Sequence, residues 1–297
     1  MDKTLLLQQL DASVNMATQS KWKRFGNAPF NYFQGVVVSK LAFRYFQQTI
    51  PTTAATFFGT KMNVLLPGGL DIYLTGAKSH PSELKLARFL VQQVQQGSVF
   101  LDIGAHYGFF SLLAEKLGAK VFAIEASPTI FDVLKKNCGA FAGIQLFNKI
   151  VADQEGDLKF YEFPGSYSEY NSISVLAYEK EKWFKENPPK VSVLQSITLD
   201  NWFLQEKTIP TIIKIDVEGA EENVLKGAKT LLQEHKPTVI MEFWGKDNAT
   251  HTRAAAILYT LGYQSYLIQN NGTLQPIADI PTYLLANGID SENVVFV

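Results

Sequence analysis

The stretch VFLDIGAHYG, residues 99–108, joins a short apolar run to a turn that contains Gly104 and Gly108. The apolar run ends in an acid, Asp102, and a new apolar segment begins after Gly108. Seventeen residues further on, a second apolar run, KVFAI, ends in Glu125. This order of strand, glycine turn, helix, strand and acid is typical of an α/β sheet that holds the adenosine half of a cofactor. Glycine admits a close backbone approach, and the second acid accepts hydrogen bonds from ribose.

The spacing of the glycines favours one cofactor over another. Dinucleotide enzymes favour G-x-G-x-x-G, whose middle glycine makes room for a pyrophosphate. Here Ala105, His106 and Tyr107 separate the two glycines, and an acid precedes the turn. A carboxylate at this point repels a pyrophosphate but suits the cationic amino-acid tail of S-adenosylmethionine. An ordinary tight turn between a core strand and a helix is the alternative interpretation.

Composition bounds the class of protein. The chain has 297 residues, of which 46% are hydrophobic, and its 27 basic and 28 acidic residues give a net charge of −1. We therefore expect no nucleic-acid partner. The single cysteine, Cys138, cannot form an internal disulfide and fits a reducing compartment. The four histidines show no metal-ligand spacing, so no metal is expected, and no apolar run approaches the ~20 residues of a membrane span. The polar N-terminus does not resemble a secretory signal, and we expect a soluble cytoplasmic protein.

The chain divides into three segments. We predict an N-terminal helical extension over residues 1–60, a hairpin and lead-in helix over 61–97, and an α/β domain over 98–297. The hairpin would pair KMNVLLP with LDIYL, and the lead-in helix would begin near Pro81. The basic, aromatic segment 21–46 has helical spacing of its apolar residues. We expect this apolar side to pack on the domain, with contact to a membrane surface or a partner as the alternative.

Strands and helices alternate from residue 98 onward, which predicts a mostly parallel sheet with helices on both faces. We expect strands at 99–103, 120–125, 144–150, 212–217, 237–243, 263–268 and 292–297. We expect helices at about 108–117, 128–139, 219–234 and 249–261. A long interruption, 153–205, separates the third and fourth strands, and an insertion of this size usually lies near the site that it serves.

A second charged motif, TIIKIDVEGAEENVL, occupies residues 211–225. Lys214, Asp216 and Glu218 alternate with period two near the end of an otherwise apolar strand, so they share one face. Ligands of open α/β sheets bind beyond the carboxyl ends of strands, where the chain order reverses. We expect these side chains beside the glycine turn, because charges buried in a strand are costly unless paired. The alternative is a structural ion pair of Lys214 with Asp216 or Glu218.

The sequence resembles the FkbM family of S-adenosylmethionine-dependent methyltransferases. The resemblance depends on LDIGAHYGFFSLLA, FAIEASP, VSVLQSITLDNW, IIKIDVEGAEENVLKGA and PTVIMEF, and it covers about residues 60–297. One departure is His106, where such sequences usually carry asparagine. The resemblance implies the class I, Rossmann-like sheet of seven strands with its last strand antiparallel, and a hairpin over residues 62–75.

The resemblance also implies a set of site residues. Asp102, Gly104, Ala105 and Gly108 would hold the methionine end of the cofactor, Glu125 its ribose and Asp153 its adenine. The complete set expected at the cofactor is Glu83, Asp102, Gly104, Ala105, His106, Gly108, Glu125, Ala126 and Asp153. Asn171 and Ser172 are weaker candidates for substrate contact. The usual acceptors of such enzymes are hydroxyl groups on sugars, polyketides and related small molecules.

Methyl transfer to a hydroxyl group needs a base for its proton. We predict that Asp216 or Glu218 is the general base and that Lys214 holds the carboxylate in place. Glu242 and His251 are rival bases, and a metal clamp of Asp216, Glu218 and Glu242 is a less favoured mechanism. A nicotinamide-dependent oxidoreductase and a non-catalytic cofactor-binding subunit are the alternative functions. The oligomeric state stays open.

Overall fold

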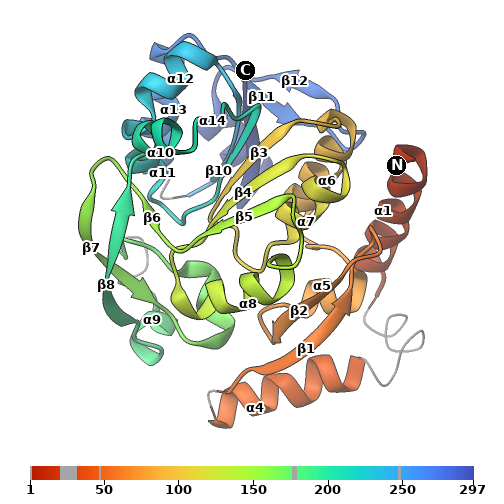
Figure 1. The fold of residues 1–297 in the computed structure, drawn as a ribbon. Coiled ribbons are helices and arrows are strands. Elements are labelled where there is room, and N and C mark those ends of the chain that lie inside the picture. Colours follow the sequence, from red (N-terminus) through yellow and green to blue (C-terminus); the bar gives the residue numbers. More distant parts are fainter. Residues whose placement is uncertain (1, 21–31, 47, 176–178, 247–248) are drawn as a thin grey trace.

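The main sheet has eight strands in the order β12-β11-β13-β10-β9-β3-β4-β5 (Figure 1). The computed structural model describes residues 2–20, 32–46, 48–175, 179–246 and 249–297. The strands of this sheet are β3 (Val99–Ile103), β4 (Lys120–Ile124), β5 (Ile144–Phe147), β9 (Ile212–Ile215), β10 (Thr238–Trp244), β11 (Ser265–Ile268), β12 (Leu274–Pro276) and β13 (Ser291–Phe296). β13 runs antiparallel between β10 and β11.

The sheet confirms the class I architecture, with one correction. All seven expected strands are present, but β12 pairs with β11 and adds an eighth strand at the edge. β12 has only three residues, LQP, and is too short to show an alternating pattern. From β3 the chain proceeds through β4 and β5 in one direction and through β9 and β10 in the other. The chain order therefore reverses between β3 and β9, where Asp102 lies in register with Lys214.

Helices cover both faces of the sheet, and each face has its own apolar core. One core includes α6 (Pro81–Gln93), α7 (Phe109–Lys116) and α8 (Pro128–Cys138). The other includes α10 (Leu199–Glu206), α11 (Glu221–Lys226), α12 (Lys229–His235), α13 (Ala249–Thr260) and α14 (Ile280–Asn287). The single helix expected at 219–234 is instead split into α11 and α12. A Cβ on Gly227 would lie 3.1 Å from the carbonyl carbon of Ala152 and still closer to its oxygen, so the chain passes close to a neighbouring segment there.

The hairpin is displaced relative to the prediction. β1 (Ile50–Ala55) pairs antiparallel with β2 (Lys61–Leu66), whereas the expected second strand, LDIYL, belongs to the helix α5 (Leu70–Thr75). The expected hairpin over 62–75 is therefore wrong. The turn between β1 and β2 closes because the Thr56 backbone N–H donates to the carbonyl of Thr60. This turn contains the expected boundary at residue 60. The helix α1 (Lys3–Thr18), which precedes the hairpin in the sequence, packs on α6.

The helix that follows residue 32 has the orientation opposite to the one expected. It comprises η1 (Phe33–Val38) and α4 (Ser39–Phe46), and its buried residues are Gly35, Ser39 and Phe43. The residues with the expected apolar spacing are exposed, so their expected packing on the domain is wrong. The exposed fractions are 54% for Phe33, 38% for Val37, 48% for Leu41 and 69% for Tyr45. Residues 21–31 of the basic segment lie outside the described residues.

The insertion between β5 and β9 forms a small sheet of its own. β6 (Ile150–Val151), β8 (Lys190–Ile197) and β7 (Gly156–Glu162) are its strands, in that order. η2 (Gly165–Tyr170) and α9 (Lys182–Glu186) lie between β7 and β8 in the sequence. None of the helices in the described ranges has the length and apolar character needed to cross a membrane.

Candidate active site

A cavity of about 560 Å³ is lined by residues that follow β3, β4 and β9, together with residues of the insertion and of the segment 68–83. Its volume is within the range of about 300–1,000 Å³ that is common for ligand sites. It lies where the order of the strands reverses, as the sequence predicts. The predicted residues that line it are Glu83, Gly104, His106, Glu125, Ala126, Asn171, Ser172, Asp216, Glu218 and Glu242.

The glycine turn lies against the end of β9. Gly104 has a φ of +77°, and a Cβ there would lie 2.8 Å from the carbonyl carbon of Asp216 and still closer to its oxygen. Gly108 has a φ of +87°, and its Cβ would meet the Sγ of Cys138 at 2.6 Å. Both glycines are therefore required by contacts within the protein. An ordinary tight turn, the alternative interpretation, therefore explains why both positions are glycine. Gly104 also lines the cavity.

Glu125 ties the end of β4 to this turn. One carboxylate oxygen accepts from the backbone N–H of His106 at 2.9 Å, and the other accepts from that of Ser127 at 2.9 Å. Burial raises the pKa of Glu125 to about 7. His106 has a φ of 50°, and its Nε2 lies 3.3 Å from the hydroxyl of Ser168. Burial, followed by the charge of Lys78, lowers the pKa of His106 to about 3, so the ring is neutral.

A buried lysine joins the two motifs. Lys214 Nζ lies 2.9 Å from a carboxylate oxygen of Asp216 and 3.9 Å from one of Asp102. Asp102 also accepts a 2.6 Å hydrogen bond from Ser111. Although burial opposes ionisation, the charges of Lys214 and Lys78 hold the pKa of Asp216 below its usual range. The ion pair of Lys214 with Asp216, expected as the alternative, is thus present, and Asp216 is an anion at the edge of the cavity.

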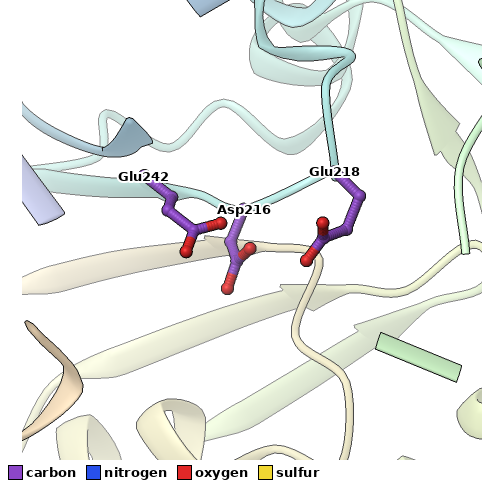
Figure 2. A group of neighbouring side chains, drawn as sticks. All are labelled: Asp216, Glu218 and Glu242. Atoms are coloured by element: carbon purple, nitrogen blue, oxygen red, sulfur yellow. The ribbon is translucent and has the colours of Figure 1, made fainter. Parts of the chain in front are cut away.

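Three carboxylates meet beside the turn. Figure 2 shows the side chains of Asp216, Glu218 and Glu242 converging, and one oxygen of each lies within 4.8 Å of the others. Burial and then the charge of Asp216 raise the pKa of Glu242 to about 8. Burial and the charge of Glu242 raise the pKa of Glu218 well above its ordinary value. This cluster, named the acid cluster below, binds protons on its glutamates more tightly than isolated carboxyl groups do. It also has the oxygen ligands that a divalent cation prefers.

The acid cluster depends on a strained loop. Glu218 has a φ of 54°, a conformation that costs a non-glycine residue about 1–2 kcal/mol. The hydroxyl of Ser172 donates to the carbonyl of Glu218 at 2.9 Å. One oxygen of Glu221 accepts from the backbone N–H groups of Val217 and Gly219, at 3.2 and 3.3 Å. These bonds from two sides hold the loop in the conformation that directs Glu218 toward the cavity.

His251 supports this loop from behind and does not line the cavity. Its Nε2 lies 3.3 Å from the second oxygen of Glu221, and neither side chain is exposed to solvent. Burial raises the pKa of Glu221 to about 7 and lowers that of His251 to about 4, so both groups favour their neutral forms. The expectation that His251 contacts substrate is therefore wrong, because the residue is fully enclosed.

Other predicted residues also lie outside the cavity lining. Asp153 is exposed and does not line the cavity, and one of its oxygens accepts from Asn223 at 3.3 Å; its contact with adenine stays a prediction. Asp102, Ala105, Gly108 and Lys214 lie behind the lining. Asn171, by contrast, lines the cavity, and its side-chain oxygen accepts from the backbone N–H of Phe163 at 2.7 Å. It therefore shapes the insertion beside Ser172.

The sequence analysis missed a lysine of the site. Lys78 lines the cavity, and its Nζ lies 3.1 Å from a carboxylate oxygen of Glu83. Although burial lowers the pKa of Lys78, the charges of Glu83 and Asp216 raise it above its ordinary value. Lys78 lies in a loop between α5 and α6, three residues before Pro81, and no spacing in that loop distinguishes it from a surface lysine.

Comparison with known proteins identifies relatives of this chain. A family model described as "Methyltransferase FkbM domain" matches residues 102–265, which are 164 of the 297 residues. The hexuronic acid methyltransferase AglP of Haloferax volcanii is 26% identical over 152 residues, which are 51% of this chain and 58% of AglP. The 2-O-methyltransferase NoeI of Sinorhizobium fredii is 27% identical over 172 residues, 54% of this chain and 70% of NoeI. A crystal structure of methyltransferase FkbM from Methylobacillus flagellatus matches with 16% identity and a TM-score of 0.42, covering 77% of this chain and 53% of that one.

Proposed function

The chain belongs to the FkbM methyltransferase family, and on that premise we propose that it transfers a methyl group from S-adenosylmethionine to a hydroxyl group of a sugar or glycan. The observation that carries the proposal is the position of the acid cluster. It lies in the same cavity as Gly104 and Glu125, so the adenosyl site that we infer at these two residues would adjoin groups that can accept a proton. The matched region spans 58% of AglP and 70% of NoeI.

The charge of the cavity supports a cationic cofactor. Of the described residues that line it, eight are acidic and three are lysines. S-adenosylmethionine carries an ammonium and a sulfonium group, which fit these acids, and Lys78 is placed to pair with its carboxylate. A dinucleotide would bring a pyrophosphate to the glycine turn, where the ionised Asp216 would repel it. The cavity therefore favours the methyl donor over the nicotinamide alternative.

The bound cofactor would supply a methyl group on a positively charged sulfur, which is already an excellent leaving group. The protein then has to hold the acceptor oxygen in line with that methyl carbon, and such positioning supplies on the order of 7–11 kcal/mol. Tyr170 and Trp244 line the cavity and are partly exposed, and they offer flat surfaces on which the apolar face of a sugar ring can rest. The cofactor is expected on the side of Glu125, and the acceptor on the side of Trp244.

The acceptor proton would go to the acid cluster. A general base works best when its pKa lies near the working pH. Asp216, ionised and held by Lys214, has too low a pKa for this role and supplies fixed negative charge. The two glutamates fit better, because the pKa of Glu242 is about 8 and that of Glu218 is raised. We therefore assign the base to Glu218 and Glu242 as a coupled pair.

The test measures binding and turnover separately. Calorimetry with S-adenosylhomocysteine should show binding to the folded protein, and labelled S-adenosylmethionine should label a hydroxylated sugar from a panel of hexoses and hexuronic acids. Glu242→Gln should retain binding but lose turnover by about 10²–10⁴-fold, the usual contribution of a general base. The matched control is Glu234→Gln, whose side chain is 60% exposed on α12. Binding without turnover on any acceptor would favour a non-catalytic subunit, and binding of NADH in place of S-adenosylhomocysteine would refute the proposal.

A further inference from the structure

The helix formed by η1 and α4 presents an apolar stripe to the outside of the molecule. Phe33, Val37, Leu41 and Tyr45 recur every four residues and are 38–69% exposed. Val38 and Phe46, 38% and 72% exposed, widen the stripe. In Figure 1 this helix lies at the lower edge of the molecule, next to β1. An exposed run of large apolar side chains on one helix face is typical of a surface that binds something.

Contacts on the opposite face fix this orientation. A Cβ on Gly35 would lie 3.0 Å from Leu70 and 3.1 Å from Tyr73, so the helix approaches α5 closely at that point. The ring of Phe43 lies 6.1 Å from that of Tyr167. Turning the stripe inward would force large side chains into the space that Gly35 now leaves. The stripe therefore faces outward, because the small residues Gly35 and Ser39 are needed on the side that packs against the protein.

Charge in this part of the sequence indicates the kind of partner. Residues 12–70 contain six basic residues and no acidic one, whereas the remainder of the chain contains 21 basic and 28 acidic residues. Three of the six, Lys21, Lys23 and Arg24, lie outside the described residues. Lys40 and Arg44 lie on the helix itself, exposed and one turn apart. Within the described ranges neither of them forms an ion pair with an acidic side chain. The net charge of −1 is therefore the sum of a basic segment, residues 12–70, and an acidic remainder.

We propose that this helix docks the protein on a membrane surface that contains anionic phospholipids. An interfacial helix inserts aromatic and aliphatic side chains among the lipids, while lysine and arginine beside them pair with headgroups. A second copy of the chain fits less well, because a symmetric contact between two stripes would bring Lys40 and Arg44 close to their own equivalents. The proposal does not depend on the reaction proposed above.

Docking in this way would bring the cavity close to the lipid. Phe43 packs against Gly165 and Tyr167 of η2, and the following residues, Ser168, Glu169 and Tyr170, line the cavity. The helix and the edge of the site are thus neighbours. An acceptor held at a membrane surface would lie within reach of the site.

The test is co-sedimentation of the full chain with two kinds of vesicle, one of phosphatidylcholine alone and one that also contains phosphatidylglycerol. The wild-type protein should bind the anionic vesicles and not the neutral ones, and added salt should weaken the binding because it screens exposed charges. This result needs no variant. Failure to bind anionic vesicles at low salt would overturn the proposal.

Two double variants locate the binding surface. Val37→Asp with Leu41→Asp should abolish vesicle binding, while the control pair Leu204→Asp with Leu285→Asp, at residues 66% and 71% exposed, should not. Lys40→Gln with Arg44→Gln should weaken binding about 25-fold, because each basic residue near the surface contributes about 1 kcal/mol, or about fivefold.

For each variant, a separate measurement must show that the protein is folded. Circular dichroism and melting temperature should match the wild type. If the stripe variants bind vesicles normally, the stripe is not the docking surface. If sedimentation shows a wild-type dimer that Val37→Asp dissociates, and no vesicle binding, a second copy covers the stripe and the lipid proposal is wrong.

Discussion

Replacing Gly104 by alanine would place a methyl group 2.8 Å from the carbonyl carbon of Asp216, and closer still to its oxygen. The obstacle is backbone, which cannot rotate away as a side chain can. The backbone at Gly104 also has a φ of +77°, a conformation that alanine rarely adopts. The substitution therefore tests two costs at once, one conformational and one steric.

A second glycine separates these two costs. Gly97 has a φ of +84°, but a Cβ there would meet nothing within 4 Å. Gly97→Ala should cost about 1 kcal/mol, which is the penalty for the left-handed conformation alone. Gly104→Ala should cost about 2–4 kcal/mol, since the overlap adds about 1–3 kcal/mol. The loss of freedom in the unfolded chain is the same for both and cancels in the comparison.

Urea unfolding of the two variants gives the difference directly. We expect the free energy of unfolding to be lower for Gly104→Ala than for Gly97→Ala by about 1–3 kcal/mol. S-adenosylhomocysteine should also bind Gly104→Ala more weakly, because the turn must move away from β9. Equal unfolding midpoints with equal slopes for the two variants would refute the argument that Asp216 makes Gly104 necessary.

Three further predictions concern charge. Glu125→Gln should weaken the binding of S-adenosylhomocysteine about tenfold or more in calorimetry, because it removes a charged acceptor worth about 1.5–3 kcal/mol; unchanged affinity would place the ribose elsewhere. Burial raises the pKa of Glu221 to about 7, so the folded state keeps a proton that the unfolded state releases above pH ~4.5. The free energy of unfolding should therefore fall between pH 5 and 8, and Glu221→Gln should flatten that fall in urea titrations; an identical slope would contradict this. Turnover should rise with pH up to about 8, following the pKa of Glu242, and should persist in EDTA; loss in EDTA with recovery in Mg²⁺ would instead show that the acid cluster holds a cation.

Much of the sheet could be predicted because its signals are local. The strands β3 and β9 are mostly apolar, with Asp102 one residue before the end of β3 and Asp216 directly after β9, and each precedes a turn with glycine. Period-two alternation predicts that Lys214 shares one face with Asp216 and Glu218, so these two acids are its expected ion-pair partners. Its ion pair with Asp216 then follows from the shared face of a strand.

The remaining features depend on contacts between distant residues. β1 reads IPTTAA and has no apolar alternation, so only its pairing with β2 reveals it as a strand. His251 has a side chain that can act as a general base and follows the strand that carries Glu242, but packing encloses it against Glu221. The spacing of Phe33 and Leu41 indicates a helix, yet it does not say which side faces inward. Gly35 decides that, through its close approach to α5.

The three-stranded sheet of the insertion is separate from the eight-stranded sheet. β6, β7 and β8 pair with one another, and none of them continues the ladder of the eight-stranded sheet. Residues 156–197 nevertheless contribute Tyr170 and Ser172 to the cavity wall. Replacing this three-stranded sheet by that of a relative would leave all strand pairings of the eight-stranded sheet unchanged. On the proposed function, exchange of residues 156–197 by recombination would alter the acceptor side of the cavity and leave unchanged the strands that carry the residues expected at the cofactor.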